Sequence, residues 1–162
     1  MPEATTLAAG DEVVLSGVRF RVLGPPAGDG RLVENDASLV LRVTHGRTSF
    51  LLAGDVEAAA EAALVARGGL ASDVVKVPHH GSRTSSGHAF TRATSPRWAV
   101  ISLGAGNRYG FPHAESVERW RGAGAEVLRT DAGPVRFLSD GLEVRRVDAA
   151  GALDALALWR GR

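Results

Sequence analysis

Three short apolar runs, each followed by a polar cluster, constrain the fold of this chain more than any other feature. The runs read TSFLLA, DVVKVP and WAVISL, and the clusters after them are Gly54-Asp55, His79 to Ser82 and Asn107 to His113. The runs have the composition of buried strands. In open α/β sheets, ligands collect at the carboxyl ends of the strands. We therefore expect the three clusters to face one pocket.

The composition is typical of one globular domain. Of the 162 residues, 44% are hydrophobic and 23% are charged, which excludes a disordered or collagen-like chain. Nineteen basic residues against eighteen acidic ones leave a net charge of +1, so a nucleic acid or a membrane surface has no overall electrostatic attraction to it. The basic residues are almost all arginine. We interpret this first as a coding bias of the genome, and only second as a sign of phosphate binding.

The absence of cysteine narrows the chemistry of any site. It excludes disulfides, thiolate metal ligands and a cysteine nucleophile, so a metal would need His, Asp or Glu ligands. No apolar run approaches the roughly 18 residues of a membrane span. Residues 1–10 lack the pattern of a secretory signal. We therefore expect the chain, as given, to be soluble.

The hydrophobic patterns predict an α/β or α+β layer with helices on one face. The predicted strands are 12–16, 18–23, 38–44, 48–53, 73–77, 98–103, 126–129, 135–138 and 142–147. The predicted helices are 56–67, 114–122 and a short tail after 148, and the predicted loops are 24–30, 79–87 and 104–113.

Asp55 has two interpretations from its position. Directly before a predicted helix, it is suited to cap the helix N-terminus. As a ligand, it would offer a hard carboxylate oxygen to a divalent cation. The adjacent His79 and His80 also have two interpretations. On an extended segment their side chains point opposite ways, so that one coordinates a metal and the other supports it or acts as an acid. Otherwise one is a core imidazole and the other is exposed.

Two other kinds of site have weaker sequence support. A serine hydrolase built on Ser82, Ser85 or Ser86 lacks a G-x-S-x-G nucleophile elbow. The glycine-rich segment 104–110 lacks G-x-G-x-x-G spacing, so it is better interpreted as an ordinary loop than as a phosphate cradle. The candidate side chains for clamping a phosphate are those of Arg83, Arg108 and Arg119.

Five blocks of the sequence together resemble the C-terminal metallo-β-lactamase-fold domain of ComEC-type DNA-internalisation competence proteins. They are 35–43 (NDASLVLRV), 50–57 (FLLAGDVE), 73–86 (DVVKVPHHGSRTSS), 107–113 (NRYGFPH) and 128–133 (LRTDAG). Their order and spacing match that family over about residues 11–147, and 148–162 form a tail. The resemblance implies a single partial domain over 1–162, mainly the C-terminal half of an αββα sandwich with a dinuclear metal site at one edge.

The resemblance also implies roles for individual residues. Asp55 would bridge two divalent metal ions, zinc or manganese, and His80 would be a ligand of the second ion. His79 would either support a metal ligand without binding the metal itself or give a proton to the leaving group.

On the substrate side, the resemblance places Tyr109 and His113 along the cleft. Substrate contacts are implied for Asn35, Ser82 and Asn107. Asn35 stands where many relatives carry another metal ligand, and Asn is usual there in this subfamily.

Two departures from the family pattern bear on metal binding and catalysis. Phe111 stands where the family commonly has the first histidine of Tyr-Gly-His-Pro-His, which leaves only His113. The H-x-H-x-D-H motif of the fold is absent, because the first histidine of the chain is His45. Only two of the expected metal ligands are present, and we expect weak or partial metal binding and poor turnover.

The resemblance implies a metal-dependent hydrolase, a phosphodiesterase or nuclease acting on DNA during competence. In that family the domain follows an N-terminal membrane-channel portion and faces outside the cytoplasm. Two alternatives stay open at this point. One is another phosphoesterase of the same fold, for example a choline-phosphate esterase, and the other is a truncated, non-catalytic fragment or one that needs a separate N-terminal half.

Overall fold

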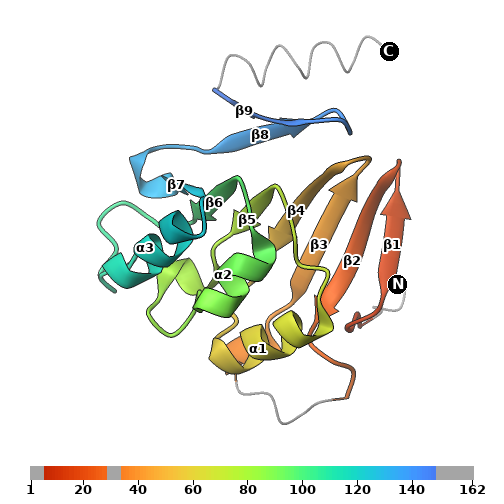
Figure 1. Cartoon of the computed structure of the whole chain (residues 1–162), viewed down its shortest axis with the longest axis horizontal. Helices are drawn as coiled ribbons and strands as arrows, with labels where there is room; N and C mark the ends of the chain where they lie inside the picture. The colour runs from red at the N-terminus through yellow and green to blue at the C-terminus, as the bar shows by residue number, and fades with distance from the viewer. Residues whose placement is uncertain (1–5, 29–33, 149–162) are drawn as a thin grey trace, which may run out of the picture.

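The computed structural model describes residues 6–28 and 34–148, which form a mixed α/β fold (Figure 1). The strands are β1 (Glu12–Leu15), β2 (Val18–Gly24), β3 (Val40–His45), β4 (Thr48–Leu52), β5 (Val74–Lys76), β6 (Trp98–Ile101), β7 (Glu126–Arg129), β8 (Arg136–Ser139) and β9 (Val144–Val147). The helices are α1 (Ala58–Arg67), α2 (His88–Thr94) and α3 (Ala114–Gly122).

The first seven strands form one mixed sheet in the order of the sequence, β1 to β7. Strands β1 to β4 pair antiparallel, with two-residue turns between β1 and β2 and between β3 and β4 and a longer connection between β2 and β3, whereas β4 to β7 pair parallel. Each parallel connection carries one helix: α1 precedes β5, α2 precedes β6 and α3 precedes β7. Because such crossovers are almost always right-handed, strands added in one direction place all their helices on one face. Figure 1 shows the three helices in front of the sheet, as the sequence predicted.

Alternation along the parallel strands divides the core into two parts. Val75 and Ala99 are both fully buried and pack with Phe90 and Trp120 from the helices. Their neighbours Val74 and Trp98 point to the other face. There they join Phe137 and Val144 of the antiparallel hairpin β8–β9. The described molecule therefore has three layers: helices, a seven-stranded sheet and a two-stranded sheet.

Most of the predicted elements are confirmed, but the segment between β5 and β6 was predicted incompletely. Helix α2 was missed because its sequence, HAFTRAT, contains two β-branched threonines and a histidine, which are weak helix formers. The expectation that 79–87 is all loop was wrong in part, since Pro78–Gly81 form a 3-10 turn. The predicted tail helix lies outside the described residues.

None of the described helices has the length and apolar character needed to cross a membrane. The mixed α/β class agrees with the fold class expected from the sequence.

Candidate active site at the carboxyl ends of β4, β5 and β6

A cavity of about 580 Å³ lies where β4, β5 and β6 end. All three clusters singled out in the sequence contribute to its lining, so the prediction that they face one pocket is confirmed. The lining residues are Asp55, His79, His80, Ser102, Leu103, Gly104, Asn107, Tyr109 and Phe111.

Asp55 is held as a carboxylate by a cation on the next strand. Lys76, at the end of β5, donates from Nζ to Asp55 Oδ1 at 3.1 Å and to the Gly54 carbonyl oxygen at 2.7 Å. Partial burial alone would raise the pKa of Asp55. The hydrogen bond and charge of Lys76, with the charges of His80 and His79, outweigh it and hold that pKa below its usual value.

The capping interpretation of Asp55 was wrong. The N-cap position of α1 is Glu57, and no side chain forms a capping hydrogen bond there. Asp55 itself points to Lys76 and His80, which leaves its carboxylate in the pocket.

His80 is oriented by the end of β6. Its Nδ1 lies 2.6 Å from the Ser102 carbonyl oxygen. A carbonyl only accepts, so Nδ1 carries the proton, and in the neutral ring Nε2 has the free lone pair. Nε2 lies 3.7 Å from Asp55 Oδ1. The backbone of β6 thus fixes which ring nitrogen of His80 faces the carboxylate.

His79 is paired with a second carboxylate, that of Glu57. The His79 Nδ1 atom lies 3.1 Å from Glu57 Oε1. The same oxygen accepts hydrogen bonds from Thr84 Oγ1 at 2.9 Å and from Asn35 Nδ2 at 3.2 Å. The bond from Thr84 is the largest contribution that lowers the pKa of Glu57. Asn35 and His79 lower this pKa further, whereas burial raises it by less than the bond from Thr84 lowers it. Glu57 is therefore an ionised acceptor that orients His79.

The backbone at the two histidines is left-handed, contrary to the extended segment expected. His79 has φ 48° and His80 has φ 53°, values that non-glycine residues rarely adopt. The expectation that the two side chains point opposite ways was therefore wrong, and both rings line the same pocket. Gly81 follows with φ 80°, and its carbonyl oxygen accepts from His113 N at 3.0 Å. That bond joins the histidine turn to the start of α3.

The remaining predicted side chains lie around this pair of histidines. Tyr109 is 68% exposed and stacks on Phe111, whose ring also contacts both histidines. Asn107 lines the pocket, but its amide bonds the backbone of Phe111. His113 packs against Phe111 behind the lining, and its buried Nδ1 has no partner among the described residues.

The three serines considered as nucleophiles are buried and already hydrogen-bonded. Ser82 pairs with Thr84, Ser85 donates to the Val56 carbonyl oxygen, and Ser86 accepts from the Trp120 indole. None of them lines the pocket. Ser82, predicted to contact substrate, is therefore buried and outside the pocket lining.

The three arginines considered for a phosphate clamp do not line the pocket either. Arg119 is engaged inside the fold, donating to the backbone oxygens of Arg83 and Ser85. Arg108 lies over the ring of Tyr109, at 5.8 Å from its centroid.

Two residues of the site were missed from the sequence. Glu57 stands two positions after Asp55, and the helix-like run around it hid its role as the partner of His79. Lys76 is the only lysine of the chain and ends a strand beside the first cluster. Its uniqueness was the signal that could have identified it.

The donor set fits part of a metal site. Two ligands on one ion at about 2.0–2.1 Å lie roughly 3.0–3.4 Å apart, and Asp55 Oδ1 and His80 Nε2 are 3.7 Å apart. A histidine whose other nitrogen donates to a backbone carbonyl is also typical of metal ligands. However, no three histidine or acidic side chains converge as a metal-binding group within the described ranges. The pair therefore fits two ligands, not a full coordination shell.

No protein-family profile matches the chain. Over 123 residues it is 37% identical to ComE operon protein 3 of Bacillus subtilis, covering 75% of this chain and 16% of that protein. It is 40% identical over 124 residues to competence protein ComA of Neisseria gonorrhoeae, covering 75% of this chain and 18% of that protein. These proteins are homologues of the chain. A third, recombination protein 2 of Haemophilus influenzae, is 36% identical over 145 residues, covering 88% of this chain and 18% of that protein. The chain spans less than a fifth of each of these three relatives.

Proposed function

We propose that this chain carries part of the catalytic pocket of a metal-dependent phosphodiesterase that acts on DNA during uptake by competent cells. The observation that carries the proposal is the pair of Asp55 Oδ1 and His80 Nε2, 3.7 Å apart in one cavity. The homologues support the setting, since two of them are named for competence or its operon.

Asp55 and His80 would hold the divalent cation, zinc or manganese. Bound there, it would act as a Lewis acid toward a phosphoryl oxygen. Both side chains are already oriented to bind it, because Lys76 keeps Asp55 ionised and the Ser102 carbonyl keeps the His80 proton on Nδ1.

His79 is the proton carrier of the proposed site. Glu57 engages its Nδ1 atom, which leaves Nε2 as the ring atom that accepts or returns a proton. A histidine beside a leaving alkoxide suits phosphodiester cleavage, because the departing oxygen must be protonated.

Phe111 and Tyr109 form the outer wall of the pocket. Their rings are stacked, with centroids 6.0 Å apart and an angle of 23° between the planes. Flat, exposed aromatic rings are surfaces on which nucleic-acid bases stack, and such contacts do not depend on base identity. This wall supports a single strand as the substrate over a small phosphoester.

We place the chain in the C-terminal half of a metallo-β-lactamase-like αββα sandwich. In this proposal it belongs outside the cytoplasm, attached to an N-terminal membrane-channel portion. The layered arrangement of helices and mixed sheet is compatible with half of such a sandwich.

Calorimetric titration of the chain with Zn²⁺ and Mn²⁺ tests the metal site. We expect Asp55→Ala and His80→Ala each to weaken binding by more than about tenfold, and His88→Ala, an exposed histidine on α2, to leave it unchanged. Hydrolysis of a labelled single-stranded oligonucleotide should follow the same order. Metal binding that ignores both substitutions would overturn the proposal.

A second candidate is a chain that is inactive alone and supplies only part of a shared site. The specific observation in its favour is that two metal-type ligands, and not three, converge among the described residues. Tight binding of two ions per chain would exclude this candidate. Binding weaker than the micromolar range, restored by adding the remaining part of a homologous domain, would support it.

A further inference from the structure

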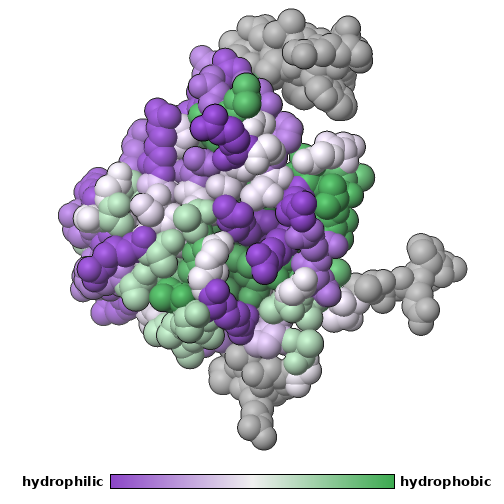
Figure 2. Space-filling view, turned by 45° about the vertical axis from the view of Figure 1, so that its right-hand side comes forward, coloured by the Kyte–Doolittle hydropathy of each residue, from purple (hydrophilic) through white to green (hydrophobic). Residues whose placement is uncertain are grey.

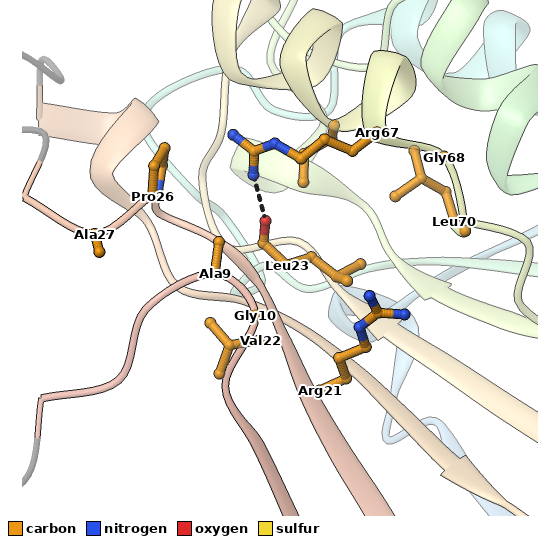
Figure 3. A pocket seen from close by; sticks show the side chains of 12 residues that line it. Ala9, Gly10, Arg21, Val22, Leu23, Pro26, Ala27, Arg67, Gly68 and Leu70 are labelled. Atoms are coloured by element: carbon orange, nitrogen blue, oxygen red, sulfur yellow. Dashed lines mark hydrogen bonds between the residues drawn. The ribbon is translucent and has the colours of Figure 1, made fainter.

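A second cavity, of about 470 Å³, lies on the helix side of the sheet and shares no lining residue with the histidine pocket. It is formed by the end of β2, the C-terminal end of α1 and the turn that follows α1 (Figure 3). Its lining residues are Ala9, Gly10, Arg21, Val22, Leu23, Pro26, Ala27, Leu64, Arg67, Gly68, Gly69 and Leu70.

The only charged side chains in this lining are two arginines. Figure 3 shows the guanidinium groups of Arg21 and Arg67 on either side of Leu23. Arg67 donates one hydrogen bond, to the Leu23 carbonyl oxygen at 2.8 Å, which leaves four of its five N–H donors for other partners. The Arg21 side chain is exposed and makes no hydrogen bond or ion pair with any described residue, whereas its backbone pairs with Glu12 and Arg42 in the sheet.

The surroundings add positive charge to this cavity without neutralising it. Arg42 stands directly opposite Arg21 across β2 and β3, an unfavourable like-charge pair. It donates from Nε and Nη2 to the Ala71 carbonyl oxygen, not to a carboxylate. On the β1 side, Arg21 stands opposite Glu12, and the carboxylate of Glu12 forms an ion pair with Arg19. Three guanidinium groups therefore gather here with no carboxylate assigned to them among the described residues.

We infer that this cavity is a binding site for one phosphate-bearing nucleotide unit of a single nucleic-acid strand. The planar forks of Arg21 and Arg67 match the oxygens of a phosphate. The walls between them are apolar, with Val22, Leu64 and Leu70 nearly fully buried. A cavity with two cations and apolar walls suits a ligand with an anionic group and a flat, weakly polar ring. The choice of a nucleic acid among phosphorylated ligands rests on the proposed function.

Anisotropy of a labelled oligothymidylate, measured on the full chain over a series of salt concentrations, tests this site. Each phosphate contact to a single strand contributes about 0.7 to the salt slope. Because both arginines contact the same phosphate, the double variant with Arg67→Gln should lower the slope by about 0.7, and Arg21→Gln alone by a measurable part of that amount. At near-physiological salt the double variant should bind roughly tenfold more weakly. Arg21→Gln removes no internal bond, so it tests the site even where Arg67→Gln destabilises the fold.

Arg145→Gln on β9 is the matched control, because this exposed arginine is paired with Glu143 on the far side of the sheet. It should leave the slope unchanged. Equal effects of the Arg21 and Arg145 substitutions, or no oligonucleotide binding by the chain, would overturn the inference. Thymidine monophosphate should compete better than inorganic phosphate, and equal competition would overturn the nucleotide assignment.

The two proposals fail separately in these experiments. Zn²⁺ titration of the Arg21→Gln variant should match that of the unsubstituted chain. A metal site that depends on Asp55 together with oligonucleotide binding that ignores Arg21 would overturn this inference alone. Oligonucleotide binding that depends on Arg21, together with metal binding that ignores Asp55, would overturn only the proposed function.

Discussion

Glu57 connects three residues from two distant segments of the sequence. One of its oxygens, Oε1, accepts from Asn35, from Thr84 and from the ring of His79. Three donors on one ionised oxygen leave little freedom for the carboxylate, and a fixed carboxylate fixes the imidazole. At the residue scale, the orientation of the His79 ring therefore depends on a residue that is itself 34% exposed and outside the pocket lining.

Glu57→Ala should change the tautomer of His79. Without the acceptor, the preference for the proton on Nδ1 should fall by about 1 kcal/mol, or roughly fivefold, the typical net value of one hydrogen bond. Nitrogen-15 chemical shifts of the ring measure the two tautomers directly. Glu118→Ala, which removes an exposed carboxylate from α3, should leave the His79 shifts in place. An unchanged ring in Glu57→Ala would show that Glu57 does not orient it.

The sequence predicted which residues form the candidate site better than it predicted their backbone conformations. Asp55, His79 and His80 were found because each followed an apolar run, and strand ends of a parallel sheet share an edge. The left-handed backbone at both histidines was not predictable, since neither is glycine and no turn signature marks them. The conformation is held by the packing of Gly81 against Pro112 and by backbone hydrogen bonds from Ser82 N to the His79 carbonyl oxygen and from His79 N to the Gly54 carbonyl oxygen.

At the scale of elements, the loop after the histidines is held by two helices. Glu61 of α1 is buried and accepts from Ser86 N at 2.5 Å and from Gly87 N at 2.8 Å. Arg119 of α3 donates to the Ser85 carbonyl oxygen at 3.0 Å, and the Trp120 indole donates to Ser86 Oγ. The loop is polar in sequence but rigidly bonded, which explains how it can support the strained turn before it.

The buried carboxyl of Glu61 makes stability depend on pH. Burial raises its pKa above the ordinary 4.5, against the opposing bonds from Gly87 and Ser86 and the charge of Arg119. The folded state then binds more protons than the unfolded state above pH 4.5. The contribution of this group is full below that pH and is lost as pH rises through the raised pKa. Urea unfolding should show the free energy of the unsubstituted chain falling relative to Glu61→Gln across that interval. A free energy of unfolding of the unsubstituted chain that instead rises relative to that of Glu61→Gln over this interval would contradict the prediction.

Gly81 is the contact between the histidine turn and the loop before α3. A Cβ atom there would lie 2.7 Å from Pro112 Cβ, with φ at +80°. We expect Gly81→Ala to lower the free energy of unfolding by about 2–4 kcal/mol, from left-handed strain of about 1–2 kcal/mol plus overpacking. Gly106→Ala shares the left-handed φ, +67°, but its Cβ meets nothing within 4 Å. It should show the strain alone, and equal losses in urea unfolding of the two variants would exclude the clash.

Elements with a clear hydrophobic period were predictable, whereas α2 was not. Helix α3 and strand β7 begin and end where the pattern placed them. Helix α2 is short, and its buried side chains include Thr91 and Thr94, whose hydroxyls bond back to helix carbonyls. These bonds are local and satisfy the hydroxyls, so that both threonines can be buried. The packing of α2 against α1 and α3 that buries them is tertiary, and local propensity does not report it.

The whole molecule has an edge that its own described residues do not cover. Strand β1 ends the seven-stranded sheet, and Val13, Val14 and Leu15 on it are 49%, 58% and 66% exposed. Figure 2, in which this side of the molecule comes forward, shows hydrophobic residues gathered at its upper right. The sequence predicted the strand from its alternation, but not that both of its faces would be open.

An uncovered apolar edge strand is a template for pairing with another chain. We therefore expect the isolated chain to self-associate as its concentration rises, in sedimentation velocity experiments. Leu15→Lys should suppress this association, because a charged side chain on an edge disfavours strand addition. It should change the free energy of unfolding by less than about 0.5 kcal/mol, as for other exposed sites. Leu142→Lys, at a residue 72% exposed beside the β8–β9 turn, adds the same charge away from the edge. If both lysine variants dissociate equally, net charge and not the β1 edge controls association. If only Leu15→Lys dissociates the complexes, strand β1 at the edge of the seven-stranded sheet is the surface through which copies of this chain associate.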